Sequence, residues 1–243
     1  MSNLIISQSP HVHSPRTMEH DMRDVVIALV PTLAASLLFF GIIYVADTIL
    51  GIPFDAYKTF VIEEKFGFNK STKGIFVTDQ IKSLLLTAII GSLLISLIEF
   101  IYNQTQDLFW ILAWTVMAVF SIFLNMFYSS IIVPLFNKQT PLEEGELRDA
   151  IQKFATSVDF KLDNIYVMDS SKRSTKANAY FSGLGKKKRV VLYDTLINDL
   201  STDEIVAVLA HEIGHYKHKH TLQMLIVSLL NTLVMLFLLG LFL

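Results

Sequence analysis

The sequence contains no cysteine, and only 17% of its 243 residues are charged. The absence of cysteine excludes disulfide bonds and thiolate metal sites, so any metal must be held by histidine and carboxylate side chains. Soluble domains contain about 25% charged residues, and the lower fraction here is typical of a membrane protein. The net charge of -2 gives no indication of nucleic-acid binding, and no nucleic-acid partner is predicted.

Hydrophobic residues make up 52% of the chain and gather in four long runs. A helix needs about 20 residues to cross the bilayer core, which is about 30 Å thick. We therefore predict four transmembrane helices, at residues ~25–50, 83–102, 108–133 and 222–243. Residues 1–24 are interpreted as a flexible N-terminal leader. The first apolar run is not a cleaved signal peptide, because it lacks the small-residue cleavage site.

Lysine and arginine are unevenly distributed among the connecting segments. Segment 51–82 has five, the short loop 103–107 has none and segment 137–220 has thirteen. Positively charged loops stay in the cytoplasm, so we expect segments 51–82 and 137–220 to lie inside and the short loop outside. The prediction is an integral, multi-pass membrane protein with a membrane region at 25–136 and a cytoplasmic segment at 137–220.

The segment 137–220 has the pattern of a small α+β unit. Its expected elements are a helix opening at 141–147, a strand at 164–168 and the two strands of a β-hairpin at 179–182 and 190–193. Ser201 and Glu204 have the spacing of a capping box and predict the start of a further helix. The predicted fold class is therefore mostly α, a polytopic membrane protein with four transmembrane helices and a small cytoplasmic α+β segment containing a β-hairpin.

The last predicted helix of this segment carries the motif His211-Glu212-Ile213-Gly214-His215. Histidines four residues apart share one face of a helix, so His211 and His215 can bind one metal ion. Glu212 can act as general base towards an attacking water, which makes it the candidate catalytic residue of a zinc peptidase. A chance match on a solvated helix is the alternative. The apolar residues before the motif and the transmembrane run after it favour the peptidase.

A zinc peptidase also needs a third protein ligand. His218 lies about 10.5 Å along a straight helix from His211, which is too far to share the ion. Thr221 stands where the metzincin pattern requires histidine, so that class is excluded. No acidic residue follows Glu212. We therefore expect the segment 222–243 to be truncated before the third ligand.

Several separated motifs occur together in one order, at 62–72, 134–137, 170–174, 177–181 and 211–220. With them, residues ~41–243 resemble the type I CAAX prenyl proteases, integral-membrane zinc endopeptidases that process prenylated CAAX proteins. The resemblance implies Zn2+ as cofactor, His211 and His215 as zinc ligands and Glu212 as the catalytic residue. It also implies a cytoplasmic active site, a lipid bilayer and a peptide or protein substrate, prenylated ones included.

The same resemblance implies that Asn178 and Ala179 border a groove in which the substrate pairs as an added strand. An ordinary hairpin is the alternative for these two residues. In the family the third zinc ligand is a glutamate beyond two further membrane helices, which this chain does not reach.

Residues ~1–40 resemble instead the N-terminus of the D subunit of Rnf-type electron-transport complexes. We therefore hypothesise a chimera with its join near 39–43, inside the first predicted span. The predicted function is a membrane-embedded zinc metalloendopeptidase that cleaves peptide bonds near the cytoplasmic face. Two alternatives stay open: an inactive truncated or chimeric fragment without the third ligand, and a subunit of a redox-driven ion-transport complex.

Overall fold

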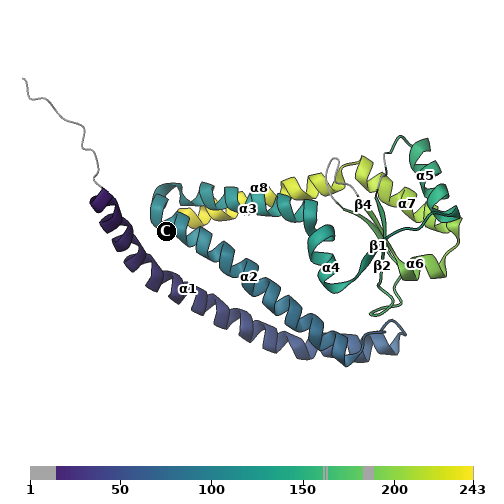
Figure 1. Cartoon of the computed structure of the whole chain (residues 1–243), viewed down its shortest axis with the longest axis horizontal. Helices are drawn as coiled ribbons and strands as arrows, with labels where there is room; N and C mark the ends of the chain where they lie inside the picture. The colour runs from purple at the N-terminus through teal and green to yellow at the C-terminus, as the bar shows by residue number, and fades with distance from the viewer. Residues whose placement is uncertain (1–14, 161, 163, 183–188, 243) are drawn as a thin grey trace, which may run out of the picture.

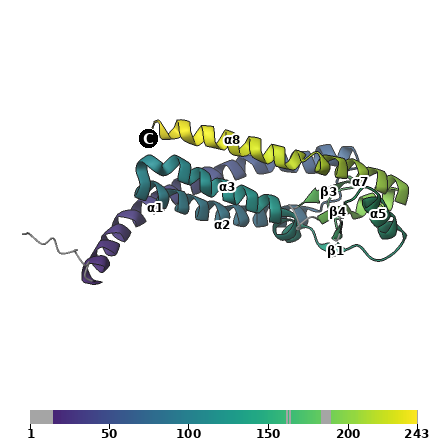
Figure 2. The same cartoon turned by 90° about the horizontal axis from the view of Figure 1, so that it is seen from above.

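A computed structural model describes residues 15–160, 162, 164–182 and 189–242. Long helices run together over most of its length, and a small mixed domain lies at one end of them (Figures 1 and 2). These helices are α1 (Pro15–Tyr57), α2 (Lys73–Thr105), α3 (Phe109–Phe127) and α8 (His220–Gly240). Short elements adjoin them: η1 (Lys58–Glu63), η2 (Gln106–Leu108), η3 (Tyr128–Ile132) and α4 (Val133–Phe136). η1 and η3 are π-helical and η2 is a 3₁₀ turn.

The four predicted transmembrane helices are confirmed as helices long and apolar enough to cross a membrane. They extend over Val30–Glu63, Lys73–Thr105, Phe109–Phe136 and His220–Gly240. The first has 34 residues, so its length of about 51 Å exceeds the bilayer core and part of it projects beyond the core.

The first helix also begins earlier than expected, because α1 starts at Pro15 and residues 15–24 of the predicted flexible leader are helical. Proline is favoured at the first helical position, and the arginine, methionine and glutamate that follow are good helix formers. Residues 1–14 of the leader lie outside the described part of the chain.

Within the described residues, four short strands form one mixed sheet in the order β1-β2-β4-β3. They are β1 (Gln139–Pro141), β2 (Ile165–Met168), β3 (Ala179–Ser182) and β4 (Arg189–Tyr193). β1 and β3 pair antiparallel to β2 and β4, and β2 pairs parallel to β4. The predicted hairpin strands pair as expected, and their connection at 183–188 lies outside the described residues. This order places β3 at an edge of the sheet.

Helices α5 (Glu146–Ser157) and α7 (Thr202–Lys217) pack against this sheet, and α6 (Asp194–Asp199) joins β4 to α7 (Figure 1). Helix α7 contributes Ile205, Leu209 and Ile213 to the core, and each is at most 3% exposed. Their spacing of four residues makes one apolar stripe along the helix. The remaining face of α7, which carries His211 and His215, therefore stays outside the core.

Helix α8 continues from α7 and packs along α3. The Trp114 indole nitrogen donates to the carbonyl oxygen of Leu229 over 2.9 Å, and the Trp110 and Phe237 rings meet edge to face at 5.2 Å. At the far end Gly240 allows close approach, because an added Cβ would lie 3.1 Å from the Cβ of Trp110. The pairing of α8 with α3 fixes the direction in which the chain leaves the motif helix.

Candidate active site

The motif helix α7 begins with the predicted capping box. Ser201 donates its backbone N–H and its hydroxyl to the Glu204 carboxylate, each over 2.8 Å. These hydrogen bonds from Ser201 hold the pKa of Glu204 below its ordinary value. The capping box satisfies N–H groups that would otherwise lack partners, so α7 begins at a defined residue. A defined start also fixes the direction in which each later side chain of α7 points.

The two motif histidines converge on the exposed face of α7. The Nε2 atoms of His211 and His215 lie 3.0 Å apart, and their ring centroids are separated by 4.6 Å. The other ring nitrogen of His215 is engaged separately, because its Nδ1 lies 2.8 Å from Nδ1 of His220. Two imidazole nitrogens therefore lie close enough together to share one metal ion.

This donor pair fits zinc. Two imidazole nitrogens bound tetrahedrally at zinc distances lie about 3.3 Å apart, close to the 3.0 Å observed. Among the described residues no group of three His, Asp or Glu side chains converges. The described residues thus include two nitrogen donors that fit one zinc ion, and Glu212 is next to His211 in sequence on the same helix.

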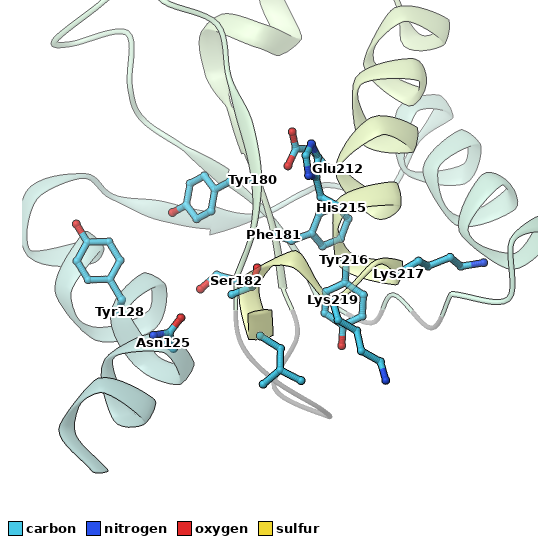
Figure 3. A pocket seen from close by; sticks show the side chains of 12 residues that line it. Asn125, Tyr128, Tyr180, Phe181, Ser182, Glu212, His215, Tyr216, Lys217 and Lys219 are labelled. Atoms are coloured by element: carbon cyan, nitrogen blue, oxygen red, sulfur yellow. The ribbon is translucent and has the colours of Figure 1, made fainter. Parts of the chain in front are cut away.

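A cavity of about 650 Å³ lies beside the motif. Figure 3 shows Glu212 and His215 on one side, with Asn125 and Tyr128 across from them. The full lining set is Asn125, Tyr128, Tyr180, Phe181, Ser182, Glu212, His215, Tyr216, Lys217, Lys219, Thr221 and Leu222. One cavity therefore joins the motif helix, the edge strand β3, the end of α3 and the start of α8.

The edge strand β3 forms part of this cavity wall and leaves backbone groups available on its open side. Tyr193 N–H donates to the carbonyl oxygen of Asn178 over 3.0 Å, which makes these two residues a hydrogen-bonded pair of the antiparallel ladder. Because such pairs alternate along a ladder, Ala179 and Phe181 direct their N–H and C=O groups away from β4. The Ala179 N–H is taken by Asn178 Oδ1 at 2.8 Å.

The predicted substrate-binding residues stand at the start of this strand. Asn178 is exposed, whereas the Ala179 side chain is 3% exposed and packs in the core. The later residues Tyr180 to Ser182 line the cavity, and Asn178 and Ala179 do not. The role assigned to this pair stays a prediction.

The cavity also brings in residues that the sequence analysis missed as site residues, above all Tyr180 and Tyr128. Burial raises the pKa of Tyr180, and its hydroxyl lies 3.3 Å from Ser129 Oγ at the π-helical segment η3. Period-two alternation along β3 could have indicated that Tyr180 faces opposite to Ala179. The partner helix, more than 50 residues earlier in the chain, leaves no local signal.

Asp194 anchors the loop that precedes β3. Its Oδ1 accepts the N–H of Ser170 at 3.0 Å, the N–H of Ser171 at 2.9 Å and the Ser170 hydroxyl, and its Oδ2 accepts the Ser171 hydroxyl. Burial raises the pKa of Asp194, but the hydrogen bonds from Ser171 and Ser170 outweigh burial and hold it below its ordinary value. The ionised carboxylate is therefore the form that stabilises this loop.

A pKa lowered by folding predicts a loss of stability in acid. The contribution of Asp194 is present above its unfolded pKa of about 3.9 and is lost as pH falls through the lower folded value. We expect Asp194→Asn to lower the thermal midpoint at pH 6 and to remove part of the acid-induced fall of that midpoint below about pH 4. Asp199→Asn, on the same helix, is the control. Equal pH dependence of wild type and Asp194→Asn would contradict this role.

Comparison with known proteins agrees with this geometry. Residues 18–138 match the family model described as CAAX prenyl protease N-terminal, five membrane helices, and residues 141–243 match peptidase family M48. The chain belongs to the CAAX prenyl proteases of family M48. The resemblance that the separated motifs indicated is thereby confirmed, as is the mostly helical membrane fold.

Curated relatives and a solved structure extend this finding. CAAX prenyl protease 1 of Saccharomyces cerevisiae is 46% identical over 216 residues, covering 84% of this chain and 45% of that protein. The human CAAX prenyl protease 1 homolog is 37% identical over 243 residues, covering 85% and 51%. The crystal structure of S. mikatae Ste24p superposes with a TM-score of 0.78 at 46% identity, covering 82% of this chain and 47% of that one. The chain thus spans about half the length of these relatives.

The comparisons do not support the chimera hypothesis or the alternatives built on it. The family match begins at residue 18 and runs to 138, so it passes without interruption through the supposed join at 39–43. The resemblance of the leader to an electron-transport subunit rested on residues 9–14 and 20–31, and the family match covers the second of these stretches.

Proposed function

We propose that this chain supplies the catalytic helix and the substrate-binding strand of a membrane zinc metalloendopeptidase. One observation carries the proposal: Glu212 and His215 line the same cavity as the open edge of β3. A general base, a metal ligand and a strand edge that can hold an extended peptide are the components that peptide hydrolysis requires. His211 and His215 are the proposed zinc ligands, with their Nε2 atoms 3.0 Å apart.

In the proposed reaction, Glu212 takes a proton from the attacking water as the new C–O bond forms at the scissile carbonyl carbon. The same carboxyl group then gives this proton to the leaving nitrogen as the C–N bond breaks. The products are a carboxylic acid and an amine, and transfer of the acid proton to the amine leaves a carboxylate and an ammonium group. Zinc, when bound, supplies Lewis acidity that polarises a carbonyl oxygen and makes water more acidic.

Strand β3 would hold the substrate by backbone pairing. The outward N–H and C=O groups of Phe181 and the C=O of Ala179 are available to a peptide that adds as a further strand. Asn178 would keep the start of β3 ordered, since its Oδ1 accepts the Ala179 N–H at 2.8 Å. Backbone pairing gives affinity with little sequence selection, and the cavity would then select the side chains.

We further propose that the site faces the cytoplasm and accepts prenylated CAAX peptides. The distribution of lysine and arginine supports the orientation, because thirteen lie in 137–220 and none in 103–107. The similarity to CAAX prenyl protease 1 of Saccharomyces cerevisiae and to its human homolog supports the substrate class. The lining residues Leu222 and Phe181 give the cavity apolar surface next to a transmembrane helix, where a membrane-bound substrate could enter.

Zinc binding by the purified chain in detergent tests the proposal. We expect about one zinc per chain, measured by competition with a chromophoric chelator, and at least an approximately tenfold lower affinity after His211→Ala. His218→Ala is the matched control, because the His218 ring stacks on that of His220 and makes no described contact with His211. Equal zinc affinity of the wild type and the His211→Ala variant would overturn the assignment of the metal site.

A further inference from the structure

His215 has a second histidine as neighbour, on the side opposite to His211. Nδ1 of His215 lies 2.8 Å from Nδ1 of His220, and the ring centroids are 4.9 Å apart. His215 therefore uses each ring nitrogen differently, with Nε2 towards His211 and Nδ1 towards His220. His220 belongs to α8, so this contact crosses from the motif helix to a transmembrane helix.

The contact depends on a break in the helix. On an uninterrupted α-helix, residues five apart are separated by about 140° around the axis, and their side chains do not meet. Between α7 and α8, Lys219 has a left-handed backbone with φ 56° and ψ 30°. This conformation is unfavourable for a residue with a Cβ. The break redirects the chain so that the ring of His220, the first residue of α8, contacts the ring of His215.

We propose that His220 is a positioning residue for His215, an inference that rests on the proposed zinc site. His215 can offer an Nε2 lone pair beside His211 only if its proton sits on Nδ1. Nδ1 of His220 must then accept that hydrogen bond, and the proton of His220 sits on Nε2. His220 thereby fixes both the tautomer and the ring orientation of His215, a role that a carboxylate or carbonyl usually fills in zinc sites.

Neighbouring histidine His218 does not share this role. Its ring stacks on that of His220 at 5.7 Å and 20°, and its backbone caps the end of α7. The His218 ring thus packs against the positioning residue and has no contact with His215 among the described interactions. His218 therefore gives a matched control two residues away.

Three variants of the full chain test the inference. His220→Phe keeps a planar ring but removes the acceptor, and we expect about a tenfold loss of zinc affinity. His220→Asn keeps an acceptor oxygen near the position of Nδ1 and should recover most of that loss. His218→Phe makes the same chemical change on the neighbouring ring and should leave the affinity within about threefold of wild type. A His220→Phe affinity equal to that of wild type, or no recovery with asparagine, would overturn the role.

A second measurement reports on the ring itself and needs no metal. ¹⁵N NMR of histidine-labelled, zinc-free chain should show His215 as the Nδ1–H tautomer in wild type and in His220→Asn, and as the commoner Nε2–H tautomer in His220→Phe. A wild-type Nε2–H tautomer would reject the inference. Failure of the proposed function would give a different result. His211→Ala would then leave the zinc affinity unchanged, while the His215 tautomer would still depend on residue 220.

Discussion

Replacing Glu212 with glutamine is expected to lower the proposed peptidase activity by about 10³-fold. Glutamine keeps the size and hydrogen-bonding capacity of glutamate but cannot take a proton from water. Glu212 lines the cavity, whereas the core contacts of α7 come from Ile205, Leu209 and Ile213. The fold and the two histidine nitrogens should therefore be unaffected, and zinc affinity should stay within about threefold of wild type.

The matched control for this variant is Glu204→Gln on the same helix. Glu204 closes the capping box with Ser201 and is fully exposed, and glutamine also closes such boxes. Activity would be followed with a quenched fluorescent peptide in membranes, with zinc content and circular dichroism measured on the same preparations. If Glu212→Gln kept more than about a tenth of the activity, the proton transfer would have to be assigned to another group.

The motif helix was the most predictable part of the molecule. Its start, its apolar stripe and the spacing of His211 and His215 are all determined by neighbours within eight residues, and each has a distinct period or residue pattern. The hairpin strands were predictable for the same reason, because alternation and a glycine-rich connection are local signals. These parts agree with the structure nearly residue for residue.

Contacts between distant segments could not be predicted in this way. Strand β1 has three residues and ends in Pro141, so it is too short to show alternation, and the parallel pairing of β2 with β4 involves strands about 25 residues apart. The contact of His215 with His220 was also hidden, because helical periodicity places these residues apart unless Lys219 is left-handed. Backbone breaks at non-glycine residues have no reliable sequence pattern.

The docking of the mixed domain on the membrane helices is another long-range feature. Arg173, in the loop after β2, donates from Nε and Nη2 to the two carboxylate oxygens of Asp79 on α2, at 2.7 and 2.9 Å, and from Nη1 to Asn137 at 2.9 Å. Around this pair the backbones of 67–70 and 173–175 are joined, with Lys70 N–H donating to Arg173 and Thr175 N–H donating to Phe68, each over 3.0 Å. The loop between β2 and β3 is thus fastened to α2.

The Arg173–Asp79 pair has the geometry of a strong interaction. Both side chains are 25% exposed and both nitrogen–oxygen contacts are short, and bidentate arginine–carboxylate pairs are stronger and more directional than single contacts. A comparison within the same chain is the Arg148–Glu144 pair, where one contact of 3.2 Å involves a glutamate that is 81% exposed. Glu144 lies before the start of α5, and ion pairs with an exposed partner contribute about 0–1 kcal/mol.

Double-mutant cycles on these two pairs should therefore give different coupling energies. We expect Arg173→Ala and Asp79→Ala each to lower the free energy of unfolding by about 2 kcal/mol, because the remaining charge is left half-buried without its partner. The double variant should lose less than the sum, giving a coupling of about 1–2 kcal/mol. The cycle on Arg148 and Glu144 should give less than about 0.5 kcal/mol.

Unfolding of detergent-solubilised chain, followed by circular dichroism, measures both cycles. Equal coupling in both would show that the pair contributes no more than an exposed ion pair. The docking of the loop after β2 on α2 would then depend on the backbone contacts between 67–70 and 173–175.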